Sequence, residues 1–116
     1  MKVYGIPNCD TVKKALDWLK ANHVDYEFHN FKKLGISTEK LQEWSNKAGL
    51  DKVMNKQSAT WKKLDPAVKD GIKTEDDALK LLLENTSMIK RPVIEKEGIL
   101  FFGFDEGEYG KQLLNY

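Results

Sequence analysis

Residues 1–19 read MKVYGIPNCDTVKKALDWL, and this stretch decides the fold prediction. The β-branched and aromatic run at residues 2–6 ends at a Pro-Asn pair, which predicts a strand followed by a turn. After the turn the apolar side chains recur at helical spacing, which predicts an amphipathic helix with its buried face at Val12, Ala15, Leu16 and Leu19.

Cys9 is the one cysteine of the chain, and it lies where the predicted strand gives way to the helix. Asn8 and Asp10, on either side of it, are candidate N-caps for that helix. Unpaired N–H groups and the helix dipole favour an anion at a helix start, and a thiolate is such an anion. Lys13 adds positive charge if its amine folds back. Two interpretations are open: a nucleophilic thiolate, which this placement favours, and a small buried apolar side chain.

The remaining pattern continues this strand and helix into a mixed sheet. Residues 25–31 predict a second strand, which completes a βαβ unit with parallel strands. Helices are predicted at residues 37–49, at residues 60–68, where a weaker helix is interrupted by Pro66, and from Thr74 onward, with Asp77 in the capping-box position. Residues 92–96 and 99–102 predict a hairpin, and residues 106–114 predict a closing helix. The order predicts one mixed α/β domain over residues 1–116, a thioredoxin-like fold with a helical insertion at about residues 34–87.

The bulk composition excludes several classes of protein. The 19 basic and 18 acidic residues leave a formal charge of +1, so charge predicts neither a nucleic-acid nor a membrane partner. No apolar run approaches the roughly 18 residues of a membrane helix, and the N-terminus does not resemble a signal peptide. One cysteine excludes an internal disulfide and fits a reducing cytoplasm. The two histidines lack a paired metal-ligand spacing, so we expect no metal site.

Arg91-Pro92 directly precedes the predicted hairpin. Proline cannot donate to a sheet ladder, so Pro92 belongs at a strand start or turn, and it is a candidate cis-proline. In a thioredoxin-like fold this loop faces the start of the first helix. Arg91 would there present its planar guanidinium to an anionic substrate or a carboxylate.

The loop at residues 55–58 is polar and basic, and two interpretations of it are open: a solvated loop, which we favour, and an anion site at Asn55 and Lys56.

The three tryptophans all fall on helical patterns, and we expect them to pack in the core or a groove: Trp18, Trp44 and Trp61.

Four stretches in this order resemble the ArsC/Spx/YffB family of arsenate-reductase-like proteins, in particular its YffB branch: YGIPNCDTVKKALDWL, NKQSATWKKL, IKRPVI and GFDEGEYGKQL. The resemblance runs essentially end to end. It implies a thioredoxin-like fold with an inserted helical region. It also implies a cysteine nucleophile at the first helix, restored by glutathione or a glutaredoxin-type thiol.

Carried over residue by residue, the resemblance places the nucleophile at Cys9 and the helix-start threonine at Thr11. It places the family's arginine before the cis-proline at Arg91, with Pro92 after it. With Asn8 and Lys13, these residues form the candidate site.

The two further arginines that hold the oxyanion in arsenate reductases are missing. Their positions correspond to Asn55, beside Lys56, and to Gly103. Charged hydrogen bonds contribute roughly 1.5–3 kcal/mol each, so we do not expect efficient arsenate reduction.

The resemblance leaves two functions open. One is a glutathione-dependent thiol oxidoreductase in which Cys9 forms a mixed disulfide and an external thiol resolves it. The other is a regulator that binds RNA polymerase, as implied by the Spx branch. That branch commonly carries a Cys-x-x-Cys switch, and Val12 occupies the second position here. We favour the first function, expect no bound cofactor, and expect a monomer.

Overall fold

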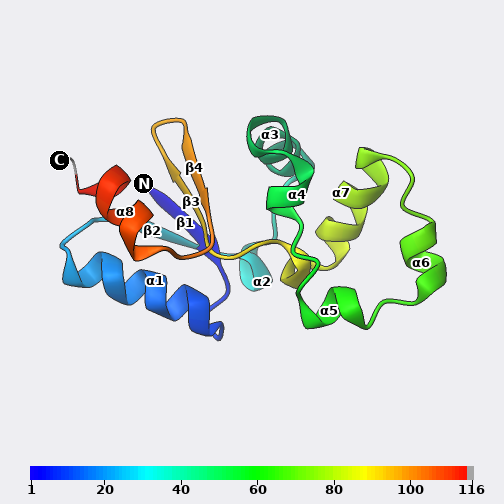
Figure 1. The fold of residues 1–116 in the computed structure, drawn as a ribbon, viewed down its shortest axis with the longest axis horizontal. Coiled ribbons are helices and arrows are strands. Elements are labelled where there is room, and N and C mark those ends of the chain that lie inside the picture. Colours follow the sequence, from blue (N-terminus) through cyan, green and yellow to red (C-terminus); the bar gives the residue numbers. More distant parts are fainter. Residues whose placement is uncertain (115–116) are drawn as a thin grey trace. The chain divides into compact units, whose positions relative to one another are not determined.

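The computed structural model describes residues 1–114, which form two compact units (Figure 1). Among the described residues, unit 1 combines Met1–Leu34 with residues 91–114, and unit 2 is Gly35–Lys90. Unit 1 holds β1 (Lys2–Gly5), α1 (Asp10–Ala21), β2 (Glu27–Asn30), α2 (Phe31–Leu34), β3 (Val93–Lys96), β4 (Ile99–Phe102) and α8 (Glu106–Leu113). Unit 2 holds α3 (Thr38–Ala48), α4 (Leu50–Val53), α5 (Ala59–Lys62), α6 (Pro66–Asp70), α7 (Glu75–Glu84) and the 3-10 helix η1 (Thr86–Met88). The expectation of a single domain stays a prediction.

Unit 1 is built on a mixed four-stranded sheet with the order β2-β1-β3-β4. β1 pairs in parallel with β2, as the helical crossover between them requires, and antiparallel with β3. β3 and β4 form the predicted hairpin. This β-α-β then β-β-α arrangement, interrupted by helices, confirms the predicted thioredoxin-like fold.

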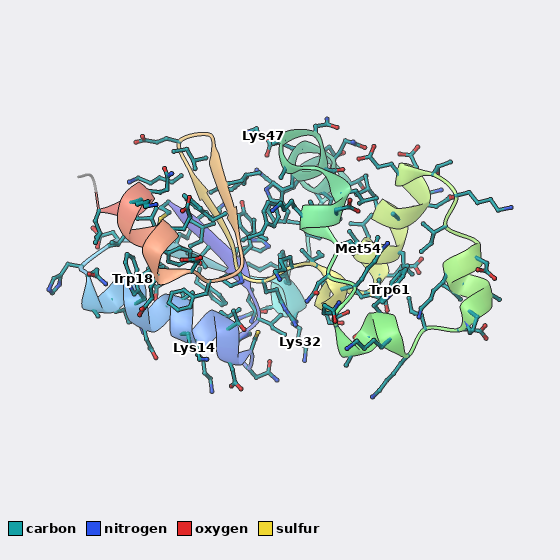
Figure 2. All side chains as sticks on the ribbon, in the orientation of Figure 1. Lys14, Trp18, Lys32, Lys47, Met54 and Trp61 are labelled. Atoms are coloured by element: carbon teal, nitrogen blue, oxygen red, sulfur yellow. The ribbon has the colours of Figure 1, made fainter. Side chains whose placement is uncertain are left out.

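Helices α1 and α8 cover one face of the sheet, and the unit's core lies between these layers (Figure 1). Tyr109 of α8 is central to it, with edge-on aromatic contacts to Trp18 and Phe104 at centroid distances of 5.5 and 5.1 Å. Trp18 is labelled in Figure 2. Buried side chains from both layers complete the cluster: Val3, Ala15, Leu19, Ile94 and Leu113.

Unit 2 is helical, as predicted, and its helix starts follow local capping chemistry. Ser37 caps α3 by accepting a hydrogen bond from the Lys40 N–H. Thr74 and Asp77 form the predicted capping box at α7. The buried apolar side chains of this unit are Leu41, Trp44, Val53, Met54, Ala78, Leu79, Leu82, Met88 and Ile89.

The structure corrects several predicted boundaries. The second strand ends at Asn30 because Phe31 begins the short helix α2. The helix expected at residues 60–68 is interrupted at Pro66 as predicted, and the structure divides it into two separate helices, α5 and α6, because a proline disfavours helical backbone at the residue before it. Asp65 instead caps α6, with Pro66 at its first position. The helices α4 and η1 were not predicted.

Candidate functional site

Cys9 is the N-cap of α1, so the prediction of Asn8 or Asp10 as the N-cap is wrong. Its backbone is extended (φ −116°, ψ 123°), and its carbonyl accepts the first helical hydrogen bond, from the Lys13 N–H at 3.0 Å. The side chain is a half-buried free thiol that makes no capping hydrogen bond.

The geometry of α1 leaves donors beside this thiol. The N–H groups of Asp10, Thr11 and Val12 precede the first helical donor, so they have no carbonyl partner within the helix. These donors and the positive end of the helix dipole favour an anion at the position of Cys9. The site can therefore stabilise a thiolate that attacks sulfur or leaves from it.

Arg91-Pro92 lies at the same edge of the sheet as the loop that carries Cys9. β3 runs antiparallel to β1 with Val93 opposite Tyr4, so the residues just before β3 lie where β1 ends. The Arg91-Pro92 peptide bond is cis, Pro92 is buried, and Arg91 is half-buried. The fold thus brings a guanidinium and the thiol to one edge of unit 1.

The other candidates near Cys9 are exposed. Asn8 lies in the turn after β1, and Thr11 and Lys13 lie in the first turns of α1. An incoming substrate can reach all three, and Lys13 brings a positive charge one turn from the N-cap. Their role in binding stays a prediction.

Asn55 and Lys56 belong to unit 2, and each has a local partner there. The Asn55 side-chain oxygen accepts a 3.0 Å hydrogen bond from the Gln57 N–H, which makes a turn of this loop. The Lys56 ammonium lies 5.6 Å from the centroid of the Trp61 ring. Substrate binding by this pair also stays a prediction.

Gly103 stands at the position where the family resemblance implies an oxyanion-binding arginine, and this glycine has a structural role of its own. Its backbone is left-handed (φ 86°), and its N–H donates a 2.9 Å hydrogen bond to the Pro92 carbonyl. Its carbonyl accepts a 2.6 Å hydrogen bond from the buried Tyr109 hydroxyl. Burial raises the pKa of Tyr109 well above its ordinary value, and the nearby Asp105 carboxylate raises it further. The position ties the cis-proline loop to α8.

Two features were not found from the sequence. Trp61, expected to be core or groove packing, is a half-buried ring that both Lys56 and Lys69 approach. Tyr4 donates a 2.6 Å hydrogen bond to Glu95 across the β1–β3 pair. The alternation of residues in the two strands could have predicted the Tyr4–Glu95 proximity once their register was known, but no sequence signal fixes the partners of Trp61.

The comparison with protein-family models gives a match to the ArsC family over residues 4–112. This chain belongs to the ArsC family. The match spans Cys9, both residues of the cis-proline loop, and unit 2.

Similar proteins agree with this assignment. An uncharacterised protein of Haemophilus influenzae is 42% identical over 107 residues, which cover 92% of this chain and 93% of that protein. The solved structure of the YFFB (PA3664) protein is 42% identical, covers 97% of both chains, and superimposes with a TM-score of 0.91. The global transcriptional regulator Spx of Streptococcus pyogenes is 28% identical over 104 residues, which cover 88% of this chain and 76% of Spx. The resemblance to the family and its YffB branch is thereby confirmed.

Among residues 1–114, no group of three or more histidine, cysteine or carboxylate side chains is placed to hold a metal ion. Over the same residues, no helix combines the length and apolar character needed to cross a membrane.

Proposed function

We propose that this ArsC-family protein is a glutathione-dependent thiol oxidoreductase of the reducing cytoplasm, with Cys9 as its nucleophile. The supporting observation is the half-buried free thiol at the N-cap of α1, beside backbone N–H groups that have no helical partner. No second cysteine exists in the chain, so an external thiol must complete the cycle.

The exchange takes two balanced steps. The Cys9 thiolate attacks the glutathione sulfur of a mixed disulfide, the S–S bond breaks, and the substrate leaves as a thiolate. A second glutathione thiolate attacks the glutathione sulfur of the new Cys9 mixed disulfide. Cys9 leaves as a thiolate, and oxidised glutathione is released. The mixed disulfide is thereby reduced to the substrate thiol, and one reduced glutathione is consumed, because it leaves in oxidised glutathione together with the glutathionyl group taken from the substrate.

Arg91 is the proposed anchor for a glutathione carboxylate, because a guanidinium matches a carboxylate with two parallel hydrogen bonds. Asn8, Thr11 and Lys13 are proposed to contact the rest of the tripeptide from the exposed start of α1. Efficient arsenate reduction is not part of this proposal, because Asn55 and Gly103 replace two arginines of the oxyanion site.

The test uses hydroxyethyl disulfide and reduced glutathione, with the formation of oxidised glutathione measured. We expect catalysis by the wild-type chain, and intact mass should show one glutathione attached after incubation with oxidised glutathione. Cys9→Ser should lose both signals while its circular dichroism spectrum stays unchanged. Equal turnover by Cys9→Ser, or a wild-type thiol that oxidised glutathione never modifies, would contradict the proposal.

A second candidate function follows from the similarity to Spx, which is named as a global transcriptional regulator. In that case we propose binding to RNA polymerase without a disulfide switch, since Val12 stands where the switch needs a cysteine. Purified RNA polymerase immobilised on a sensor surface would retain both the wild-type chain and Cys9→Ser. No retention of either chain would eliminate this candidate.

A further inference from the structure

Unit 2 contains a pocket of about 270 Å³. It opens between α4, α5, α6 and the start of α7, and its apolar wall is formed by Leu50, Met54, Trp61 and Ile72. Met54 and Trp61 are labelled in Figure 2. Ligand pockets commonly measure roughly 300–1,000 Å³, so this one suits a small ligand of one or two fused rings.

Two ammonium groups give this pocket a local positive charge. Lys56 and Lys69 both line it, and their Nζ atoms lie 5.6 and 5.1 Å from the centroid of the Trp61 ring. Among the described residues, neither amine has a hydrogen bond or ion pair, so both keep donors for a ligand. Asp51 is the one acidic side chain of the lining, and the two lysines outweigh it.

The walls of the pocket are held by hydrogen bonds within unit 2. Ser58 caps α5 by accepting from the Trp61 N–H at 3.1 Å, and Thr60 of the same helix bonds to Ser87 at 2.6 Å. Met54, which also lines the pocket, forms a β-bridge with Ile89. Trp61 and Met54 therefore line the cavity from segments that are held by hydrogen bonds within unit 2, which lowers the entropy cost of binding.

We propose that this pocket binds a small aromatic carboxylate. The ring of the ligand lies against Trp61 and Met54, where it buries apolar surface and contacts a polarisable sulfur. Its carboxylate lies between the Lys56 and Lys69 ammonium groups and accepts charge-assisted hydrogen bonds from them. An aromatic amine of the same shape would be repelled by the same two charges. The site uses none of the residues proposed above for the thiol exchange, which are Cys9, Arg91, Asn8, Thr11 and Lys13, and it does not depend on that exchange.

The test is a nuclear magnetic resonance titration with 2-naphthoate, read at the indole N–H signals of the three tryptophans. Trp61→Phe assigns the signal of Trp61. We expect 2-naphthoate to shift that signal saturably while the Trp18 signal stays in place, and 2-naphthylmethylamine at equal concentration to shift neither. Cys9→Ser should bind 2-naphthoate as the wild type does, which separates this result from the fate of the proposed thiol activity.

A matched pair of double variants tests the role of the two amines. Lys56→Gln/Lys69→Gln should weaken 2-naphthoate binding by about tenfold or more, because it removes both charged partners. Lys62→Gln/Lys63→Gln removes two exposed lysines of the same segment that do not line the pocket, and it should leave the affinity unchanged. A wild-type shift that does not saturate, equal binding of the amine, or unchanged affinity in the first double variant would overturn the proposal.

Discussion

The Lys13 N–H donates a 3.0 Å hydrogen bond to the carbonyl of Cys9, and this bond makes Cys9 the N-cap of α1. Serine, threonine, aspartate and asparagine are the usual residues at this position, because their side-chain oxygens accept from the next N–H groups. The Cys9 side chain makes no such capping hydrogen bond. The helix start loses some stability, and the thiol lies where an anion is favoured.

The first prediction concerns the reactivity of Cys9. Iodoacetamide at neutral pH should alkylate Cys9 in the folded chain, with the product read by intact mass, because the free thiol is half-buried and open to a small reagent. The same chain in urea is the control, because it keeps the neighbouring residues and gives the rate of a fully exposed thiol. A folded chain that does not react while the unfolded chain does would favour the interpretation of Cys9 as packing.

The second prediction concerns Arg91 in the proposed exchange reaction. Arg91→Gln should raise the KM for reduced glutathione by about tenfold and change kcat less, because it removes a carboxylate contact made in the ground state as well as in the transition state. Arg91→Lys should recover only part of the loss, since an ammonium lacks the planar fork.

The neighbouring Lys90→Gln is the control for Arg91. It removes a positive charge one residue earlier in the chain and should leave KM unchanged. If Arg91→Gln and Lys90→Gln behaved alike, Arg91 would not anchor glutathione.

How well each feature could be predicted depends on whether its cause is local. The Thr74–Asp77 capping box follows from two residues at a fixed spacing, and the sequence predicted it correctly. The N-cap of α1 was missed, because Asn8 and Asp10 have better capping side chains and the end of β1 decides which residue begins the helix.

Contacts between residues far apart in the sequence could be predicted only where the predicted order of strands and helices places those residues together. The βαβ and hairpin patterns together place Arg91-Pro92 and the Cys9 loop at one edge of the sheet, which sequence reasoning could anticipate. The pocket at Trp61 depends on how four short helices pack, and Pro66 breaks the periodic pattern there. No local rule pairs Trp61 with both Lys56 and Lys69.

The third prediction concerns Tyr109. Tyr109→Phe should lower the free energy of unfolding at neutral pH by about 1–3 kcal/mol, because it leaves the buried Gly103 carbonyl without its donor. Burial raises the pKa of Tyr109, so the neutral phenol stabilises the fold fully below the ordinary tyrosine pKa of about 10 and loses this contribution as pH rises further.

Urea unfolding measured at increasing pH above 10 tests this alkaline effect. The wild type should lose stability more steeply there than Tyr109→Phe does. Tyr26→Phe is the control for the loss of a tyrosine, and it should keep the wild-type slope. Parallel slopes for the wild type and Tyr109→Phe would show that Tyr109 does not carry the alkaline sensitivity.

The fourth prediction concerns the capping box of α7. The N–H groups of Lys73 and Thr74 donate to the Asp77 carboxylate at 3.1 and 3.2 Å, and these bonds lower the pKa of Asp77 from 3.8. The ionised form therefore stabilises the fold above pH 3.8, and the contribution is lost as pH falls through the lowered value.

Asp77→Asn should accordingly be less stable than the wild type at neutral pH, and the two should converge as the pH is taken below 3.8. Thr74→Ala, which removes the other half of the box, should cost about 1 kcal/mol at neutral pH. Asp76→Asn is the matched control, since it removes a carboxylate from the same helical turn outside the box. If the difference in the free energy of unfolding between the wild type and Asp77→Asn stayed unchanged in acid, the ionised Asp77 carboxylate would be excluded as its origin.

The fifth prediction concerns the contact between β1 and the first turn of α1. Gly5 is buried, and a Cβ atom added there would lie 2.9 Å from Cγ2 and 3.3 Å from Cγ1 of Val12. Val12 is fully buried and has a stiff β-branched side chain, so α1 itself would have to move. Gly5→Ala should therefore lower the free energy of unfolding by about 1–3 kcal/mol.

A second substitution, at Val12, should relieve this clash, so the contact between Gly5 and Val12 can be tested directly. Val12→Ala alone should destabilise the chain by removing buried methyl groups. In Gly5→Ala/Val12→Ala the new methyl group fills part of the space that Val12 vacates, so the double variant should lose less stability than the two single losses added together. Urea unfolding of the four chains gives this coupling. Additive losses would mean that the backbone around Gly5 accommodates a side chain without pressing on α1, and that the start of the helix, with Cys9, is not set by this contact.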